Sequence, residues 1–167
     1  HSTIYQNIDS IVLVKTLDSI FDSNPIFVSN GFDYPVGIHG SADGYVRGQP
    51  FWNENYHLGE DWSANMFPNR GFGTPIRSIS NGYVILAKEE KGGWGNVVRI
   101  VHKLNSDTLQ YVESLYGHLN KIFVDSGDLI LKHTKIGTMG NADGRFVTHL
   151  HFEIRKDVTL PTGGGYG

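Results

Sequence analysis

Glycine is spread along the whole chain between short apolar runs, and this spacing restricts the folds open to it. The sequence holds 21 glycines in 167 residues, about 13%, against roughly 7% in average proteins. Glycines placed in this way supply tight turns between strands. Asn81-Gly82 is the strongest such signal, because both residues tolerate the positive φ of a two-residue hairpin. We expect strands over 57–63, 75–80, 82–88, 96–103, 109–119, 121–124, 135–139 and 148–155.

Short strands joined by short turns predict a mainly β fold built from antiparallel sheets. Residues 1–33 differ from this pattern and form an N-terminal appendage. Apolar residues at helical spacing predict a helix there, while the apolar run 11–14 would equally fit a strand. Residues 34–158 make up the main domain, and the glycine-rich residues 159–167 are expected to be a flexible tail. The helical spacing is that of Leu13, Leu17, Ile20 and Phe21.

Composition excludes several classes of protein. The chain has 14 Lys and Arg against 17 Asp and Glu, a net charge of −3, which argues against nucleic acid as the main partner. The longest apolar runs, such as 83–87, are far too short to span a bilayer, so we expect no transmembrane segment. Because the chain has no cysteine, thiolate metal sites and cysteine nucleophiles are excluded. Any metal ion must therefore be held by His, Asp or Glu.

Histidines and one aspartate recur at strand spacing in three segments. In 57–61 and in 148–153, polar side chains an even number of positions apart share one face of a strand, which brings each pair together. In 116–119 the polar rings of Tyr116 and His118 flank a glycine and are expected on one face of the strand. Together the three segments supply five groups that converge: His57, Asp61, His118, His149 and His151.

Five convergent groups exceed what a hydrolytic zinc site needs. Such a site uses three protein ligands and leaves the fourth position to water. We therefore expect three ligands and two further groups that act as bases or hydrogen-bond donors near the water. Each motif alone is a weak signal, and we interpret Glu60 and Glu153 as surface charges or as partners of a ligand. His102 is interpreted as a structural histidine on a strand beside the site.

The loop 91–96 is rich in glycine and is expected to border a groove, because glycine lets a substrate backbone approach closely. Trp94 would supply an apolar wall, and Asn96 a polar contact. On a regular strand Tyr116 shares a face with His118, so its hydroxyl would reach the substrate carbonyl. The alternatives are simple packing for Trp94 and a core position with a satisfied hydroxyl for Tyr116.

Six segments occur in one fixed order between about residues 34 and 156. In this order they resemble the lysostaphin-type, or LytM-like, zinc peptidases that cut the peptides of bacterial peptidoglycan. The segments are His57-Leu-Gly-Glu-Asp61, the stretch 73–84 that begins Gly-Thr-Pro, the stretch 93–102 that begins Gly-Trp-Gly, Tyr116-Gly-His-Leu119, the stretch 135–140, and His149-Leu-His-Phe-Glu153.

The resemblance implies antiparallel sheets with hammerhead-type hairpins that form a substrate groove, with one zinc ion per chain on its floor. His57, Asp61 and His151 match the family's metal ligands. His118 and His149 match the two histidines that line the catalytic water without binding the metal. The implied protein is a zinc metalloendopeptidase that hydrolyses stem or cross-bridge peptides of peptidoglycan in the bacterial cell envelope, either periplasmic or extracellular.

Some members of this family have lost these residues, so the alternative is a catalytically silent module that binds peptidoglycan or activates a cell-wall hydrolase. A biotinyl- or lipoyl-like carrier is a third interpretation, although no lysine at an exposed hairpin tip supports it. Two segments depart from the family pattern, 39–56 and Val147-Thr148, and both bear on the shape of the groove. The sequence leaves open which bond is cleaved, whether the N-terminal segment covers the groove, and the oligomeric state.

Overall fold

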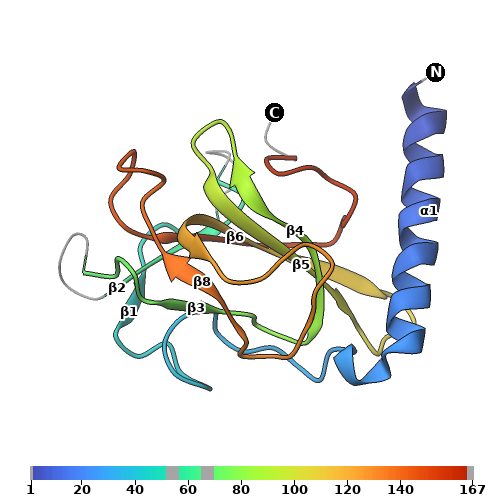
Figure 1. Cartoon of the computed structure of the whole chain (residues 1–167), viewed down its shortest axis with the longest axis horizontal. Helices are drawn as coiled ribbons and strands as arrows, with labels where there is room; N and C mark the ends of the chain where they lie inside the picture. The colour runs from blue at the N-terminus through green and yellow to red at the C-terminus, as the bar shows by residue number, and fades with distance from the viewer. Residues whose placement is uncertain (1, 52–56, 65–69, 165–167) are drawn as a thin grey trace.

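One helix and nine strands form the described part of the protein, a computed structural model that covers residues 2–51, 57–64 and 70–164 (Figure 1). Helix α1 spans Ser2–Ser23 and is followed by the short 3-10 helix η1 (Pro25–Phe27). The strands are β1 (Tyr45–Arg47), β2 (Glu60–Ala64), β3 (Pro75–Arg77), β4 (Gly82–Glu90), β5 (Gly95–Lys103), β6 (Tyr111–Ile122), β7 (Leu129–Ile130), β8 (Lys135–Met139) and β9 (Leu150–Arg155).

The paired strands within these ranges are antiparallel, which confirms the predicted mainly β fold. The sheet runs in the order β1-β2-β9-β6-β5-β4-β7, and β8 pairs with both β3 and β6. The register places Asp61 of β2 and Gly117 of β6 on either side of His151 in β9. Three neighbouring strands that are distant in sequence therefore meet at one point of the sheet.

The main core lies on the face of the sheet opposite to the side chain of His151. Because side chains alternate along β9, Leu150 and Phe152 point into this core. The ring of Tyr116 on β6 packs 5.3 Å from that of Phe152, measured between centroids. The core also takes apolar side chains from β4, β5 and β8, among them Val84, Ile100, Ile136 and Met139.

Helix α1 stands at one edge of the molecule (Figure 1). Its residues Leu17 and Phe21 are fully buried in a second cluster that includes Val101 of β5 and Tyr111 of β6. The appendage is thus a helix, as its apolar spacing indicated, and not a strand. It ends where Asn24 precedes the proline that begins η1, since proline disfavours helical backbone in the residue before it.

A buried cluster of three charged residues, which we call the arginine clamp, holds the chain after β9. Arg99 of β5 donates two hydrogen bonds to Glu113 of β6, at 3.0 and 2.7 Å, and Arg155 of β9 donates another at 3.0 Å. Both guanidinium groups also donate to the backbone oxygen of Leu160, and Arg155 donates to that of Pro161 at 2.9 Å. The clamp fixes the path of the chain beyond the last strand.

The arginine clamp contacts the first part of the stretch 159–167, for which we expect a flexible tail. Residues 159–164 are held by the clamp and by local turns, such as the hydrogen bond from Gly164 N–H to the Pro161 oxygen at 2.9 Å. Residues 165–167 lie outside the described residues. We call residues 160–164 the C-terminal segment.

Several strands differ from the expected ranges. β2 begins at Glu60, three residues after the expected start, and β3 ends at Arg77, because residues 79–81 form a bend. The expected strands over 109–119 and 121–124 are one strand, β6. The short strands β1 and β7 carry no sequence pattern that we recognised. None of the helices described here is long and apolar enough to cross a membrane.

Candidate metal centre

A cavity of about 660 Å³ opens where β2, β6 and β9 meet. All five convergent polar groups expected from the sequence line it, together with two glycine-containing loops and an aromatic rim. No residue of 10–33 belongs to its described wall, so this part of the N-terminal appendage does not cover it. The lining residues are Gln49, His57, Asp61, Gly92, Gly93, Trp94, His118, Phe146, Val147, His149, His151 and Gly163.

Three potential metal ligands lie together on the floor of the cavity. One donor atom from each of His57, Asp61 and His151 falls within 4.8 Å of the other two. His57 Nε2 is 3.1 Å from Asp61 Oδ1, and His151 Nδ1 is 3.2 Å from the same oxygen. Two imidazole nitrogens and a carboxylate oxygen suit zinc where no thiolate is present.

Gly59 makes room for one of these rings. A Cβ atom at this position would lie 2.8 Å from Cε1 and 2.9 Å from Nε2 of His151. The glycine between His57 and Asp61 therefore admits the His151 imidazole. Any side chain at residue 59 would displace a candidate ligand.

The other ring nitrogen of each candidate histidine ligand already has a partner. His57 Nδ1 lies 2.9 Å from the backbone oxygen of Pro50, and His151 Nε2 lies 2.9 Å from Glu153 Oε1. Because a carbonyl or carboxylate oxygen only accepts, each of these nitrogens carries the proton in a neutral ring. In the neutral ring the remaining nitrogen, Nε2 of His57 or Nδ1 of His151, is unprotonated and faces Asp61, as a metal ligand must. In the absence of an ion the same nitrogen can take a second proton and donate it to the Asp61 carboxylate.

The three groups also shift one another's protonation. Burial alone raises the pKa of the Asp61 carboxyl, but the hydrogen bond from His151 and the nearby imidazole charges bring the pKa below its usual value. Burial lowers the pKa of His151, and its hydrogen bonds to Asp61 and Glu153 more than offset this, raising the pKa to about 8. The cluster therefore favours a negative carboxylate surrounded by groups that can take positive charge.

His118 and His149 lie at the wall of the same cavity, above the three donor atoms. His118 Nδ1 is 3.1 Å from the Trp94 backbone oxygen, and His149 Nδ1 is 2.7 Å from that of Val147. Each ring thus presents an unprotonated Nε2 in its neutral form. Burial, assisted by the nearby His149 and His151, lowers the pKa of His118 to about 4, so this ring is neutral near pH 7.

His118 reaches the cavity because the backbone of β6 departs from regular strand geometry. Its φ is +60°, in the left-handed region that non-glycine residues rarely adopt. On a regular strand, the register that turns Gly117 toward His151 would turn both Tyr116 and His118 into the core. The left-handed turn redirects His118 alone, and its backbone N–H donates to the Trp94 oxygen at 2.9 Å.

Tyr116 therefore does not share a face with His118, which corrects the expectation that its hydroxyl reaches a substrate. The side chain is fully buried in the main core. Its hydroxyl accepts a hydrogen bond from the Ile79 N–H at 3.1 Å and lies 3.1 Å from Ser114 Oγ. Burial raises the pKa of Tyr116 to about 12. This is the core position with a satisfied hydroxyl that we gave as the alternative.

The loop 91–96 contributes Trp94 to the cavity but not Asn96. The Trp94 ring lies edge-on to His151, with 5.3 Å between centroids, and stacks near His118 at 6.3 Å. Asn96 instead donates from Nδ2 to the Asn120 backbone oxygen at 3.1 Å and does not line the cavity. This amide ties β5 to β6, so the expected polar contact with a substrate is corrected.

Four lining residues were not predicted: Gln49, Phe146, Val147 and Gly163. Phe146 is 46% exposed, and its ring lies 4.9 Å from that of His118 and 5.9 Å from that of His149. Gln49 and Val147 belong to the two segments that depart from the family pattern, which is the signal that could have indicated them. Gly163 had no such signal, because the arginine clamp that places it joins residues far apart in sequence.

Comparison with known proteins supports a hydrolytic centre. A family model described as peptidase family M23 matches residues 55–161. An uncharacterized metalloprotease of Buchnera aphidicola subsp. Baizongia pistaciae is 38% identical over 140 residues, covering 74% of this chain and 35% of that protein. DD-carboxypeptidase/endopeptidase Mpg of Neisseria meningitidis serogroup B is 35% identical over 114 residues, covering 64% of this chain and 23% of that protein. The chain thus spans about a third or less of these relatives.

Among solved structures, the antimicrobial peptidase lysostaphin from Staphylococcus simulans has a similar fold, with a TM-score of 0.55. The two sequences are 25% identical, and the match covers 74% of this chain and 52% of that one. The similarity therefore extends over most of this chain.

Proposed function

The chain belongs to peptidase family M23, and we propose that it is a zinc-dependent endopeptidase that hydrolyses peptide bonds in the stem or cross-bridge peptides of bacterial peptidoglycan. The observation that carries this proposal is the set of histidine hydrogen bonds around one cavity. His57, His118, His149 and His151 each bond a neighbour through one ring nitrogen and turn the other inward. Two of the inward nitrogens, Nε2 of His57 and Nδ1 of His151, face the same oxygen of Asp61, as two ligands of a single ion would.

In this proposal His57, Asp61 and His151 hold one zinc ion per chain. Their donor atoms are close enough to meet on one ion, and their chemistry matches its preference for nitrogen and carboxylate oxygen. Bound zinc supplies a Lewis acid and brings the pKa of a water molecule to about 7. The hydrogen bonds from His57 to Pro50 and from His151 to Glu153 keep the two rings oriented for this role.

His118 and His149 handle the protons. Their Nδ1–H groups are fixed on backbone oxygens, so each Nε2 is free to accept a proton from the attacking water. The protonated ring then donates to the developing oxyanion or returns the proton to the leaving amine. Their ring centroids lie only 4.7 Å apart, which places both groups within reach of one peptide bond.

The walls of the cavity fit an extended peptide. Gly92 and Gly93 expose backbone on one side, while Trp94 and Phe146 add apolar surface close to the two proton-handling histidines. We place the activity in the bacterial cell envelope, periplasmic or extracellular, because that is where peptidoglycan lies. A catalytically silent module that binds peptidoglycan or activates a hydrolase is the alternative, and the complete set of five polar groups favours the enzyme.

The test is digestion of purified peptidoglycan preparations of defined cross-link type, with released peptides identified by mass spectrometry and zinc measured in the same sample. We expect peptide release that stops when a chelator removes the metal and returns when zinc is restored. A protein that carries one zinc per chain yet leaves every cross-link type intact would contradict the enzyme and support the silent module.

A further inference from the structure

Glu153 lies directly beside the candidate ligand His151, and we infer that it is a positioning residue that selects which nitrogen of His151 binds the metal. This inference depends on the metal centre of the proposed function but not on the reaction. The side chains at 151 and 153 share a face of β9, since they are two positions apart on a strand. Glu153 Oε1 accepts the hydrogen bond from His151 Nε2 at 2.9 Å.

His151 is oriented differently from the other three histidines of the cavity. His57, His118 and His149 all bond a backbone oxygen through Nδ1 and turn Nε2 inward. His151 bonds a carboxylate through Nε2 and turns Nδ1 toward Asp61, 3.2 Å from Oδ1. The reversal needs an acceptor at the Nε2 side of the ring, and Glu153 provides it.

The position of Glu153 indicates that this acceptor is more than a surface charge. The residue is 1% exposed, and a buried carboxylate is costly unless it is paired. Its partner ring is held between the backbone of Gly59, where a Cβ atom would come within 2.8 Å, and the edge-on indole of Trp94. The imidazole therefore sits in a fixed slot, and the carboxylate determines which nitrogen carries the proton.

A carboxylate behind a histidine ligand has a defined effect on metal binding. It fixes the tautomer and raises the basicity of the nitrogen that faces the ion, and its loss usually weakens binding by about 10- to 100-fold. In this chain the expected triad is Glu153, His151 and the ion. Glu60 offers a matched comparison, because it adjoins the ligand Asp61 but is only partly buried and pairs with Arg47 at 2.8 Å on the surface.

The experiment measures zinc affinity of the full chain by competition with a chelator, for wild type, Glu153→Ala, Glu153→Gln and the control Glu60→Gln. We expect about 100-fold weaker binding for Glu153→Ala and about 10-fold for Glu153→Gln, which keeps an acceptor but loses the charge. Glu60→Gln should bind zinc as wild type does.

A second measurement reads the tautomer itself. Nitrogen-15 NMR of the zinc-free protein, recorded at alkaline pH where the ring is neutral, should show the proton of His151 on Nε2 in wild type and in Glu60→Gln, and a shift toward Nδ1 in Glu153→Ala. A Glu153 that served only the stability of the fold would not change the tautomer in a folded variant.

The inference is overturned if both Glu153 variants bind zinc like Glu60→Gln, or if His151 keeps its proton on Nε2 in Glu153→Ala. Should Glu153→Ala fail to fold, the near-isosteric Glu153→Gln decides by its affinity alone. Neither measurement uses a peptide substrate. The role of Glu153 can therefore hold although the protein does not cleave peptidoglycan, and it can fail although the protein does cleave it.

Discussion

The imidazole of His118 meets that of His149 edge to face, with ring centroids 4.7 Å apart and planes inclined by 64°. His118 belongs to β6, whereas His149 directly precedes β9, and the two rings are held by different backbone oxygens, those of Trp94 and Val147. Neither ring belongs to the group of three donor atoms around Asp61. In the proposed mechanism this pair moves protons beside the metal ion that the other three groups hold.

His118→Ala and His149→Ala should each keep zinc and lose turnover. Removing a proton-transfer group usually costs about 10²- to 10⁴-fold in rate, and the three donor atoms are untouched by either change. The measurement is kcat on a soluble cross-linked peptide together with zinc content. Asp61→Ala, in contrast, should lose the metal, and a His118→Ala enzyme with full turnover would rule out its proposed role.

Tyr116→Phe should weaken the fold and spare the reaction. The change leaves the buried Ile79 N–H without its acceptor, which costs about 1–3 kcal/mol in unfolding free energy. Because Tyr116 is fully buried in the core and does not line the cavity, kcat/KM should stay within about twofold of wild type. Denaturant unfolding and steady-state kinetics measure the two effects. A large loss of kcat in a stably folded variant would show that Tyr116 takes part in the reaction.

Gly163→Ala should impair substrate binding. Its φ is +76°, so a side chain there strains the backbone, and the added methyl group would contact Trp94 in the cavity wall, with Cβ 3.4 Å from Nε1. We expect KM to rise about tenfold, equivalent to about 1.4 kcal/mol, with zinc content unchanged. Gly127→Ala is the control, because Gly127 has φ +104° with nothing within 4 Å of its Cβ position. Equal KM values in the two variants would show that the C-terminal segment has no part in binding.

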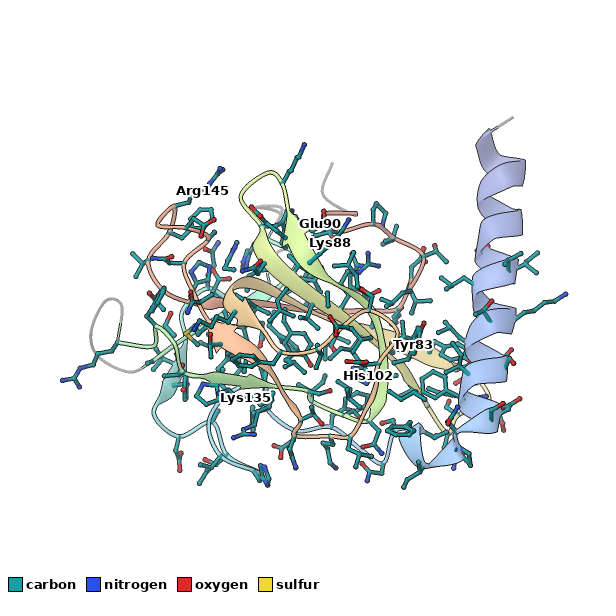
Figure 2. All side chains as sticks on the ribbon, in the orientation of Figure 1. Tyr83, Lys88, Glu90, His102, Lys135 and Arg145 are labelled. Atoms are coloured by element: carbon teal, nitrogen blue, oxygen red, sulfur yellow. The ribbon has the colours of Figure 1, made fainter. Side chains whose placement is uncertain are left out.

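Protonation of His102 should lower the unfolding free energy in mild acid. The side chain is fully buried within the body of the protein (Figure 2), and burial lowers its pKa to about 4 although the hydrogen bond to Asn81 opposes this. Its ordinary value is about 6.5, so the unfolded chain binds the proton more tightly. The stability that His102 contributes is therefore complete above pH 6.5 and is lost as the pH falls to about 4, a change on the order of 3 kcal/mol.

The check is the unfolding free energy of wild type and His102→Gln between pH 7 and pH 4. Glutamine can still bond the Asn81 oxygen but does not titrate, so the variant should lose part of the pH dependence. His39→Gln, at an exposed position, should follow the wild-type curve. Parallel curves for wild type and His102→Gln would contradict the assignment.

The grouping around Asp61 could be predicted from the sequence because it depends on simple alternation along strands and on a resemblance carried by contiguous motifs. The position of His118 followed from the family motif but not from alternation, since a left-handed φ at a histidine leaves no periodic signal. For the same reason Tyr116 was assigned to the wrong face. Local pattern is thus reliable only where the backbone stays regular.

The ends of the domain were harder to predict, because their contacts are with residues distant in the sequence. Helix α1 could be expected from the spacing of Leu17 and Phe21, but its docking against Tyr111 could not. The fixed course of the C-terminal segment depends on Arg99 and Glu113, more than forty residues upstream of it. A glycine-rich stretch is predicted to be flexible when the residues that bind it lie far away in the sequence.

The arginine clamp also decides where the chain leaves the domain, since it delivers Gly163 to the rim of the cavity. A cell-wall-binding module fused after residue 164 would be joined to the rim of the cavity by a very short linker. Such a tether sets an effective concentration in the millimolar range for short flexible links. Avidity for an insoluble polymer could thus be added at this exit without altering any group that takes part in the chemistry.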